Sequence, residues 1–142
     1  MRVTLLLADA AQAANGKLYV LGGGWSVTGP APTPHAVAIK IDVPWDQANV
    51  KHHWRLALET EDGAPVRADT PEGEQPIKVE GDFEVGRPPG IAPGTPIDLP
   101  LAIGVGPVQL ASGTRYLWRF SIDDRSEPDW HLAFNVRSDA PG

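Results

Sequence analysis

The sequence contains no cysteine and a single methionine among its 142 residues. Without thiols the chain can form no disulfide, no thiolate nucleophile and no zinc–sulfur site. This composition fits a reducing compartment, and we expect a cytoplasmic protein. The apolar start, residues 1–8, is short for the core of a signal peptide, and Asp9 interrupts it. No stretch approaches the roughly 20 apolar residues of a membrane-spanning helix, so the sequence predicts a soluble protein without membrane contact.

Positive charge is also scarce. Twelve Lys and Arg residues face 18 Asp and Glu residues, which gives a formal net charge of −6 at pH 7. A protein that binds nucleic acid through its phosphates needs a basic face, whereas the basic residues here are scattered along the chain. Nucleic-acid binding is therefore disfavoured, and the expected partner is a protein, either a different one or a second copy of this chain.

Helix-forming segments are nearly absent. The 15 prolines and 15 glycines break the chain before any long helical periodicity develops. Only two short stretches, Asp9 to Ala14 and Pro44 to Ala48, are expected to form single helical turns. The length of the chain is common for one domain, and we expect a single β-sandwich domain over residues 1–142, with residues 138–142 as a flexible tail.

The dominant hydrophobic period is two, which indicates strands with one buried and one solvent-facing side. The clearest stretches of this kind are residues 35–43, 77–85, 115–122 and 130–137. Further strands are expected at residues 2–8, 17–21, 50–60, 65–67 and 97–105, and an acidic loop at 70–75. Asn15-Gly16 and Asp62-Gly63 are turn signals between them. About 7–9 short strands at this spacing predict an all-β, antiparallel sandwich or a small barrel.

One local pattern favours the sandwich. Leu110, Gly113 and Tyr116 have the spacing of the tyrosine corner found in immunoglobulin-like and fibronectin-type domains. An inward-facing tyrosine on an ordinary strand would give the same spacing, and this alternative stays open. The sequence thus predicts an immunoglobulin-like antiparallel β-sandwich. The residues expected between its two sheets are Tyr116, Trp118, Phe120, Trp130, Leu132 and Phe134.

Two groups of titratable residues are candidates for a metal site or for an acid–base pair. His52 and His53 are adjacent on an expected strand, so they point to opposite faces and cannot hold one ion together. Glu80, Asp82 and Glu84 alternate along another strand. We interpret these carboxylates as a charged solvent face that protects a sheet edge, because no apolar pocket surrounds them to raise a pKa. No metal site is predicted.

No other motif carries recognisable catalytic chemistry. Gly22 to Gly24 lack the strand-to-helix context of a phosphate-binding loop, and we interpret them as a bend that lets Trp25 cover the core. The serines lie in no nucleophile motif. We therefore predict no catalytic residue, no cofactor and no enzymatic activity.

The candidates for an interaction site lie around the proline- and glycine-rich loop from Arg87 to Pro96. Prolines reduce the entropy that a loop loses when it is ordered on binding. Arg87 and Ile91 are predicted to be its polar and apolar anchors beside Glu84, and Trp45 is predicted to be an exposed contact in a separate turn. The alternative is that this loop only connects two strands.

Several stretches resemble an uncharacterised family of small all-β proteins from high-GC Gram-positive bacteria. They are LADA at residues 7–10, GKLYVLGGGW at 16–25, Asp62-Gly63, and the ending with Tyr116, Trp130 and Phe134. The likeness runs along the full length. The resemblance implies a β-sandwich with no established activity, and it carries no functional residue to this chain.

Two functions of different classes follow. The first is a non-enzymatic protein-interaction or assembly module, which includes self-association and a structural place in a larger assembly such as a phage-type particle. The alternative is a small-ligand or carbohydrate-binding domain that uses Trp25, Trp45 and the loop of residues 87–96, because sugars stack on exposed aromatic faces.

Overall fold

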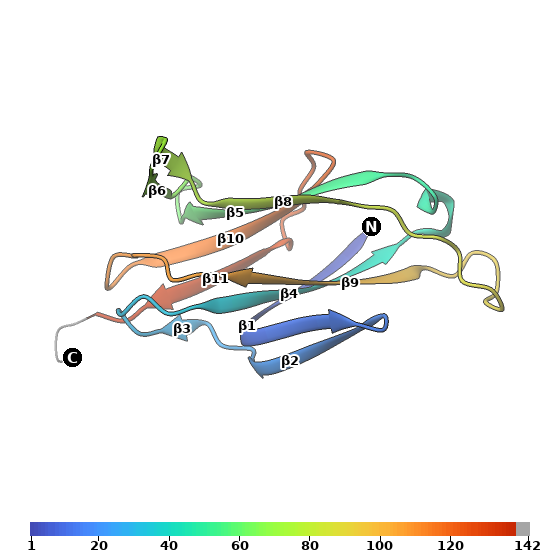
Figure 1. Ribbon diagram of the computed structural model, residues 1–142, viewed down its shortest axis with the longest axis horizontal. Coiled ribbons are helices and arrows are strands. Elements are labelled where there is room, and N and C mark those ends of the chain that lie inside the picture. The colour runs from blue at the N-terminus through green and yellow to red at the C-terminus, as the bar shows by residue number, and fades with distance from the viewer. Residues whose placement is uncertain (139–142) are drawn as a thin grey trace.

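The computed structural model describes residues 1–138 and is built of β-strands joined by turns and loops (Figure 1). The strands within these residues are β1 (Arg2–Ala14), β2 (Lys17–Gly23), β3 (Val27–Thr28), β4 (His35–Val43), β5 (His52–Thr60), β6 (Arg67–Thr70), β7 (Gly73–Pro76), β8 (Lys78–Phe83), β9 (Ile97–Val105), β10 (Arg115–Ile122) and β11 (His131–Val136). A short 3₁₀ turn, η1 (Trp45–Gln47), precedes β5. The predicted tail lies, from residue 139 on, outside the described residues. No helix in residues 1–138 is long and apolar enough to cross a membrane.

The strands form two main sheets and one small hairpin. The first sheet has the order β2-β1-β4-β9, and the second has the order β3-β11-β10-β5-β8. Neighbouring strands are antiparallel except for β3 and β11, which run parallel. The predicted all-β, antiparallel architecture is thus confirmed, and it is consistent with a β-sandwich. Strands β6 and β7 pair with each other alone, where the sequence predicted a short strand at residues 65–67 and an acidic loop at residues 70–75.

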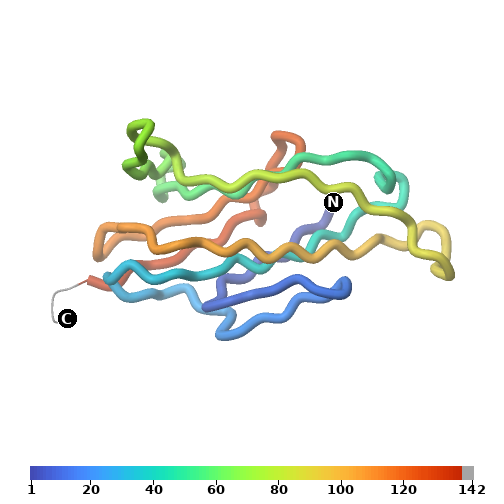
Figure 2. The backbone as a smooth tube through the Cα atoms, in the orientation of Figure 1, coloured from blue at the N-terminus to red at the C-terminus, as the bar shows by residue number. Residues whose placement is uncertain are grey.

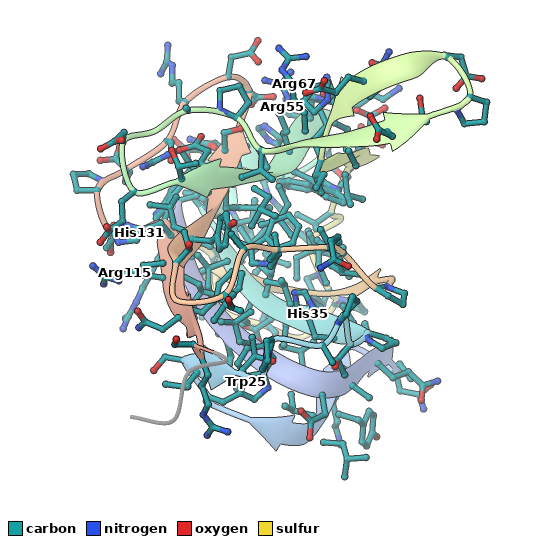
Figure 3. The ribbon with its side chains drawn as sticks, turned by 90° about the vertical axis from the view of Figure 1, so that its left-hand side faces the viewer. Trp25, His35, Arg55, Arg67, Arg115 and His131 are labelled. Atoms are coloured by element: carbon teal, nitrogen blue, oxygen red, sulfur yellow. The ribbon has the colours of Figure 1, made fainter. Side chains whose placement is uncertain are left out.

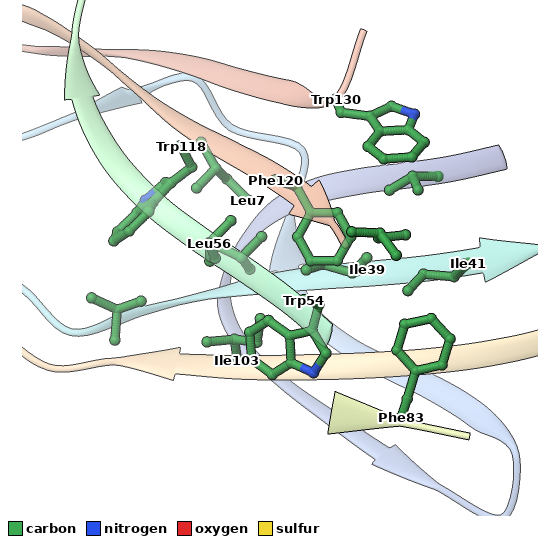
Figure 4. Close-up of a cluster of buried hydrophobic side chains, with 14 of the residues drawn as sticks. Leu7, Ile39, Ile41, Trp54, Leu56, Phe83, Ile103, Trp118, Phe120 and Trp130 are labelled. Carbon is green, nitrogen blue, oxygen red and sulfur yellow. The ribbon is translucent and has the colours of Figure 1, made fainter. Parts of the chain in front are cut away.

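The core lies where alternate residues of the second sheet face the first (Figure 4). On β10 every second side chain from Tyr116 to Ile122 is buried, and the same holds on β5 from His52 to Leu58. The register between β10 and β5 places these two buried rows side by side, because Trp118 on β10 lies directly opposite Leu58 on β5. Five of the six predicted core residues are buried, and Leu132 is half-buried against them.

Strand β4 departs from alternation, since its residues Ala36 to Ile39 are all buried. Its inner face, with Val37 and Ile39, packs in the core, and Ala36 and Ala38 on its outer face are buried as well. Strand β1 pairs with β4 only as far as Ala8, opposite Ala36, and then pairs with β2. After Ala8 the second half of β1 turns back and runs beside β2 (Figures 1 and 2). This turn brings β1 and β2 close to β9. Small side chains such as Ala38 permit this close approach.

Two local features shape this part of the chain: the bend at the glycines of residues 22–24, and the turn at the tip of the β1–β2 hairpin. Gly22 has a φ of +61°, and a Cβ there would collide with the Asp9 carboxylate. The Gly24 N–H donates a hydrogen bond to the Leu7 carbonyl at 2.7 Å, so the glycine segment forms the bend that the sequence predicts. At the tip, Asn15 and Gly16 both have positive φ, as a two-residue hairpin turn requires.

The helical turn predicted for Asp9 to Ala14 is wrong, because these residues are the second half of β1. The hairpin turn and the pairing with β2 outweigh the helix propensity of the alanines. The turn predicted for Pro44 to Ala48 is confirmed as η1.

Candidate functional site

The predicted anchors around the proline-rich loop are only partly brought together. Arg87 Nε and Nη2 donate hydrogen bonds to the Trp45 carbonyl at 3.2 and 2.8 Å. The Arg87 guanidinium also lies 4.6 Å from the centre of the Trp45 ring, in a cation–π contact. Ile91 is half-buried in the loop, and Glu84 is exposed after β8. Arg87 therefore stabilises the turn that holds Trp45, and the role of these four residues in binding stays a prediction.

The tryptophans proposed for a sugar site lie at opposite ends of β4. Trp25 packs edge-on against His35, the first residue of β4, with ring centres 5.7 Å apart. Trp45 follows shortly after Val43, the last residue of that strand. A strand of this length spans roughly 25–30 Å. One small ligand therefore cannot stack on both Trp25 and Trp45.

The adjacent histidines point to opposite faces of β5, as predicted. The buried His52 places Nδ1 2.7 Å from Asp123 Oδ2 and Nε2 3.3 Å from the Gln47 carbonyl. The exposed His53 places Nδ1 2.9 Å from Asp82 Oδ1 and Nε2 3.2 Å from Glu80 Oε1. In residues 1–138 no group of three or more histidine or carboxylate side chains could hold a metal ion.

The carboxylates of β8 belong to a charged network on the outer face of an edge strand. Glu80 accepts a hydrogen bond from Arg55 Nε at 2.8 Å and lies 3.6 Å from Lys78 Nζ. The hydrogen bond from Arg55 and then that from His53 lower the pKa of Glu80 to about 2. Hydrogen bonds with Asp82 first and Glu80 second raise the pKa of His53. This network is a solvated, charge-paired face of the kind that keeps a sheet edge from pairing with another chain.

His35 is held in one neutral tautomer. The indole Nε1–H of Trp118 donates to His35 Nε2 at 3.1 Å. Since an indole nitrogen can only donate, Nε2 must carry the lone pair and the proton must sit on Nδ1. Burial lowers the pKa of His35, and a backbone hydrogen bond with Thr33 offsets this only in part. Protonation of Nε2 would leave the buried Trp118 N–H without an acceptor.

The β1–β2 hairpin, residues 2–23, exposes a group of large apolar side chains. Leu21 is 72 % exposed, Tyr19 52 %, Val20 40 % and Leu6 38 %. Strand β2 is the terminal strand of its sheet, and Lys17 is its only charged residue. Beyond Lys17 at its start, β2 therefore lacks the charges and prolines that usually protect an edge strand. The unbroken apolar run from Leu18 to Leu21 was a sequence signal for this surface, because neither face of such a strand is polar.

A cavity of about 290 Å³ opens at the end of the molecule that carries Trp25 and His35 (Figure 3). Its walls come from segments far apart in the sequence: Trp25, the loop of residues 29–34, His35, Val108, Leu110 and Phe134. Trp25 also stands at 87° to the Phe134 ring, with ring centres 6.3 Å apart. Apart from the proline-rich composition of residues 29–34, no sequence pattern indicated this cavity.

The family model of a family of unknown function, DUF6941, matches residues 3–137. The chain belongs to DUF6941. The match includes both sheets, the β1–β2 hairpin and the cavity, so all of them are parts of the DUF6941 domain. No curated protein and no solved structure matches the chain.

The stability of this DUF6941 domain should fall on acidification through His35. Because burial lowers the folded-state pKa of His35, the unfolded chain binds a proton more readily, and stability is lost as pH falls below 6.5, the ordinary pKa of histidine, toward the folded-state pKa. His53, whose pKa is raised, has the opposite effect: its contribution is present below 6.5 and is lost as pH rises through the folded pKa.

The check is urea unfolding at about pH 5 and about pH 7.5, on either side of the histidine range, for the parent, His35→Gln and His53→Gln. We expect His35→Gln to lose less stability than the parent on acidification, and His53→Gln to lose more. Equal losses in the parent and His35→Gln would contradict the role of His35.

Proposed function

We propose that this protein is a non-enzymatic assembly module that self-associates by pairing β2 of one copy with β2 of another. The observation that carries the proposal is the exposure of Tyr19, Val20 and Leu21 on an unprotected terminal strand. Single exposed apolar residues are common on protein surfaces, but a contiguous apolar patch marks a contact surface. The free N–H and C=O groups of an edge strand are satisfied best by a further strand.

The residues of β2 are complementary to themselves. In an antiparallel pair centred on Val20, Tyr19 of one copy lies opposite Leu21 of the other, and Lys17 lies opposite Gly23. Aromatic–aliphatic cross-strand pairs are favourable, and like charges directly opposite would be unfavourable. No such charge pair arises in this register. The same patch therefore serves both copies, as a two-fold symmetric interface requires.

The absence of enzymatic activity is supported by the state of the histidines. All four have hydrogen-bond partners within the protein: His35 with Trp118, His52 with Asp123, His53 with Asp82, and His131 Nδ1 with the Pro128 carbonyl at 2.7 Å. In residues 1–138 none of these contacts joins a histidine to a hydroxyl nucleophile, which is the pairing that a nucleophilic enzyme site uses.

We further infer that the sandwich is of the immunoglobulin-like type. The hydroxyl of the buried Tyr116 accepts a hydrogen bond from the Ala111 N–H at 3.0 Å, back across the corner in which Gly113 has a φ of +73°. This is the arrangement of a tyrosine corner. We propose a cytoplasmic setting in a bacterium, supported by the lack of cysteine, where the paired modules are parts of a larger assembly such as a phage-type particle.

Sedimentation velocity over a concentration series tests the self-association. We expect the average mass of the parent to rise toward that of a dimer, and Leu21→Lys to weaken association at least about tenfold, or about 1.4 kcal/mol. Val50→Lys is the matched control, because Val50 is also an exposed apolar residue (47 %) but lies outside the hairpin. A parent that stays monomeric at every concentration, or equal weakening by both variants, would overturn the proposal.

A further inference from the structure

The cavity beside Trp25 and His35 carries one uncompensated negative charge. Asp9 is the only acidic residue that lines it, and no lysine or arginine lines it in the described part of the chain. His35 adds no positive charge, because it accepts the Trp118 hydrogen bond as a neutral imidazole. The Asp9 carboxylate has no hydrogen-bond or ion-pair partner within residues 1–138. An anion in this cavity would therefore meet Asp9 without any balancing cation.

The position of Asp9 keeps its carboxylate within reach of a bound molecule. Asp9 follows the bend of β1 and lies opposite Gly22, between two residue pairs of the β1–β2 ladder. The carboxylate lies so close to Gly22 that a Cβ there would collide with it. Asp9 is nevertheless exposed, and because the ladder occupies the backbone on either side, its accessible surface belongs mainly to the side chain. A molecule in the open cavity can thus contact this carboxylate.

Trp25 gives the same cavity an aromatic wall. Its ring stands at 70° to that of His35 and at 87° to that of Phe134, with ring centres 5.7 and 6.3 Å apart. Neither ring is therefore stacked flat on the indole. The indole nitrogen is buried, so the half-buried side chain offers ring carbon to the cavity rather than its N–H. Aromatic surface attracts organic cations through the negative face of the ring.

The loop of residues 29–34 forms a wall that is rich in hydrogen-bond acceptors. Three of its six residues are prolines, which have a carbonyl group but no N–H. A ligand that donates hydrogen bonds therefore meets more acceptors than competing donors on this wall. Val108 and Leu110, both half-buried, add apolar surface. The volume of about 290 Å³ is at the lower end of the range of ligand pockets, about 300–1,000 Å³, and suits a compact molecule.

We propose that this cavity binds a small organic cation, a primary ammonium group attached to a compact apolar ring. The ammonium group pairs with the Asp9 carboxylate and donates its remaining hydrogen bonds to the acceptor-rich wall. The ring packs against Trp25 and the apolar side chains. The site is independent of the proposed β2 interface, since none of residues 19–21 lines it.

Benzylamine, which is a cation at pH 7, is the probe that tests the proposal. Benzyl alcohol and benzoate are a neutral compound and an anion of similar shape. Binding is followed by NMR through the indole N–H signals of the five tryptophans in a ¹⁵N-labelled sample. We expect benzylamine to shift the Trp25 signal saturably, and the other two compounds to bind at least about tenfold more weakly. The Trp45 signal, from the far end of β4, should stay in place.

Asp9→Asn is the deciding variant, because it keeps the size of an exposed side chain and removes its charge. It should weaken benzylamine binding at least about tenfold. Asp62→Asn is the matched control, since it removes the same charge at an exposed turn position that does not line the cavity. Salt screens an exposed ion pair, so added NaCl should weaken benzylamine binding to the parent but change that of Asp9→Asn little.

Three results would overturn the proposal. The first is no saturable shift of the Trp25 signal with benzylamine, and the second is equal affinity of the parent for benzylamine and benzyl alcohol. The third is an equal effect of Asp9→Asn and Asp62→Asn, which would assign binding to the net charge of the protein instead of Asp9. The comparison of the three compounds uses the parent alone, so the test stays decisive if Asp9→Asn fails to fold.

Discussion

Replacing Trp118 by alanine should lower the free energy of unfolding by roughly 3–5 kcal/mol, as is usual when a large buried aromatic side chain is truncated. Trp118 is fully buried and lies on β10 with Leu58 opposite it on one side and Leu132 on the other. The truncation removes this packing and also the hydrogen bond to His35. Since domains of this kind are stable by only about 5–15 kcal/mol, the loss would be a large share of the total.

Urea unfolding followed by circular dichroism measures this effect without relying on tryptophan fluorescence. Trp118→Phe separates the two contributions, because it keeps most of the packing but leaves His35 Nε2 without its donor. Its loss should be clearly smaller than that of Trp118→Ala. Trp45→Ala is the control at a half-buried tryptophan. If Trp118→Ala were no more damaging than Trp45→Ala, the placement of Trp118 at the centre of the core would be wrong.

Replacing Asp123 by alanine should cost about 1–3 kcal/mol, the usual cost of an unsatisfied buried polar group. Its carboxylate accepts from the buried His52 Nδ1 at 2.7 Å and from the His53 N–H at 2.9 Å. Asp123 itself is about half exposed, so solvent screens the charge attraction. The loss arises mainly because His52, which is only 6 % exposed, would keep a polar nitrogen without a partner.

Two further variants sharpen the test by thermal unfolding. Asp123→Asn should recover part of the loss, since asparagine keeps an acceptor oxygen and tolerates the positive φ of 52° at this position. Asp124→Ala is the neighbouring control, because its side chain is 81 % exposed and lies 3.7 Å from Arg55. Equal, small effects of Asp123→Ala and Asp124→Ala would show that His52 does not depend on Asp123.

The parts of the fold that the sequence predicts are those with a one-sided burial pattern. On β5 and β10 each side chain faces either the core or solvent, so a period of two is visible directly in the order of residues. The second half of β1 has no such pattern, because alanines dominate it and alanine favours helices. The second half of β1 is a strand only because it pairs with β2, for example Ala11 with Val20.

The candidate sites were harder to predict, because each depends on which distant segments meet. Sequence reasoning could assign Arg87 and Trp45 to loops, but not the hydrogen bonds between them across 42 positions. The cavity requires Trp25, Val108 and Phe134 to converge, and the order of the sheets decides that. The exposed edge of β2 likewise follows from the sheet order, although the run Leu18 to Leu21 carried a local signal for it.

The parallel pairing of β3 with β11, in which Val27 lies opposite Asn135, has a consequence for how the domain is made on the ribosome. The centre of the second sheet, β10 with β11, is the last part of the domain to be synthesised, and β5, which can pair earlier with β8, gains its second neighbour β10 only then. Non-local pairings of this kind slow folding. Core residues of β4 and β5 that pack against β10 and β11 therefore stay exposed until translation has passed Val136, and the nascent chain is open to aggregation during that interval.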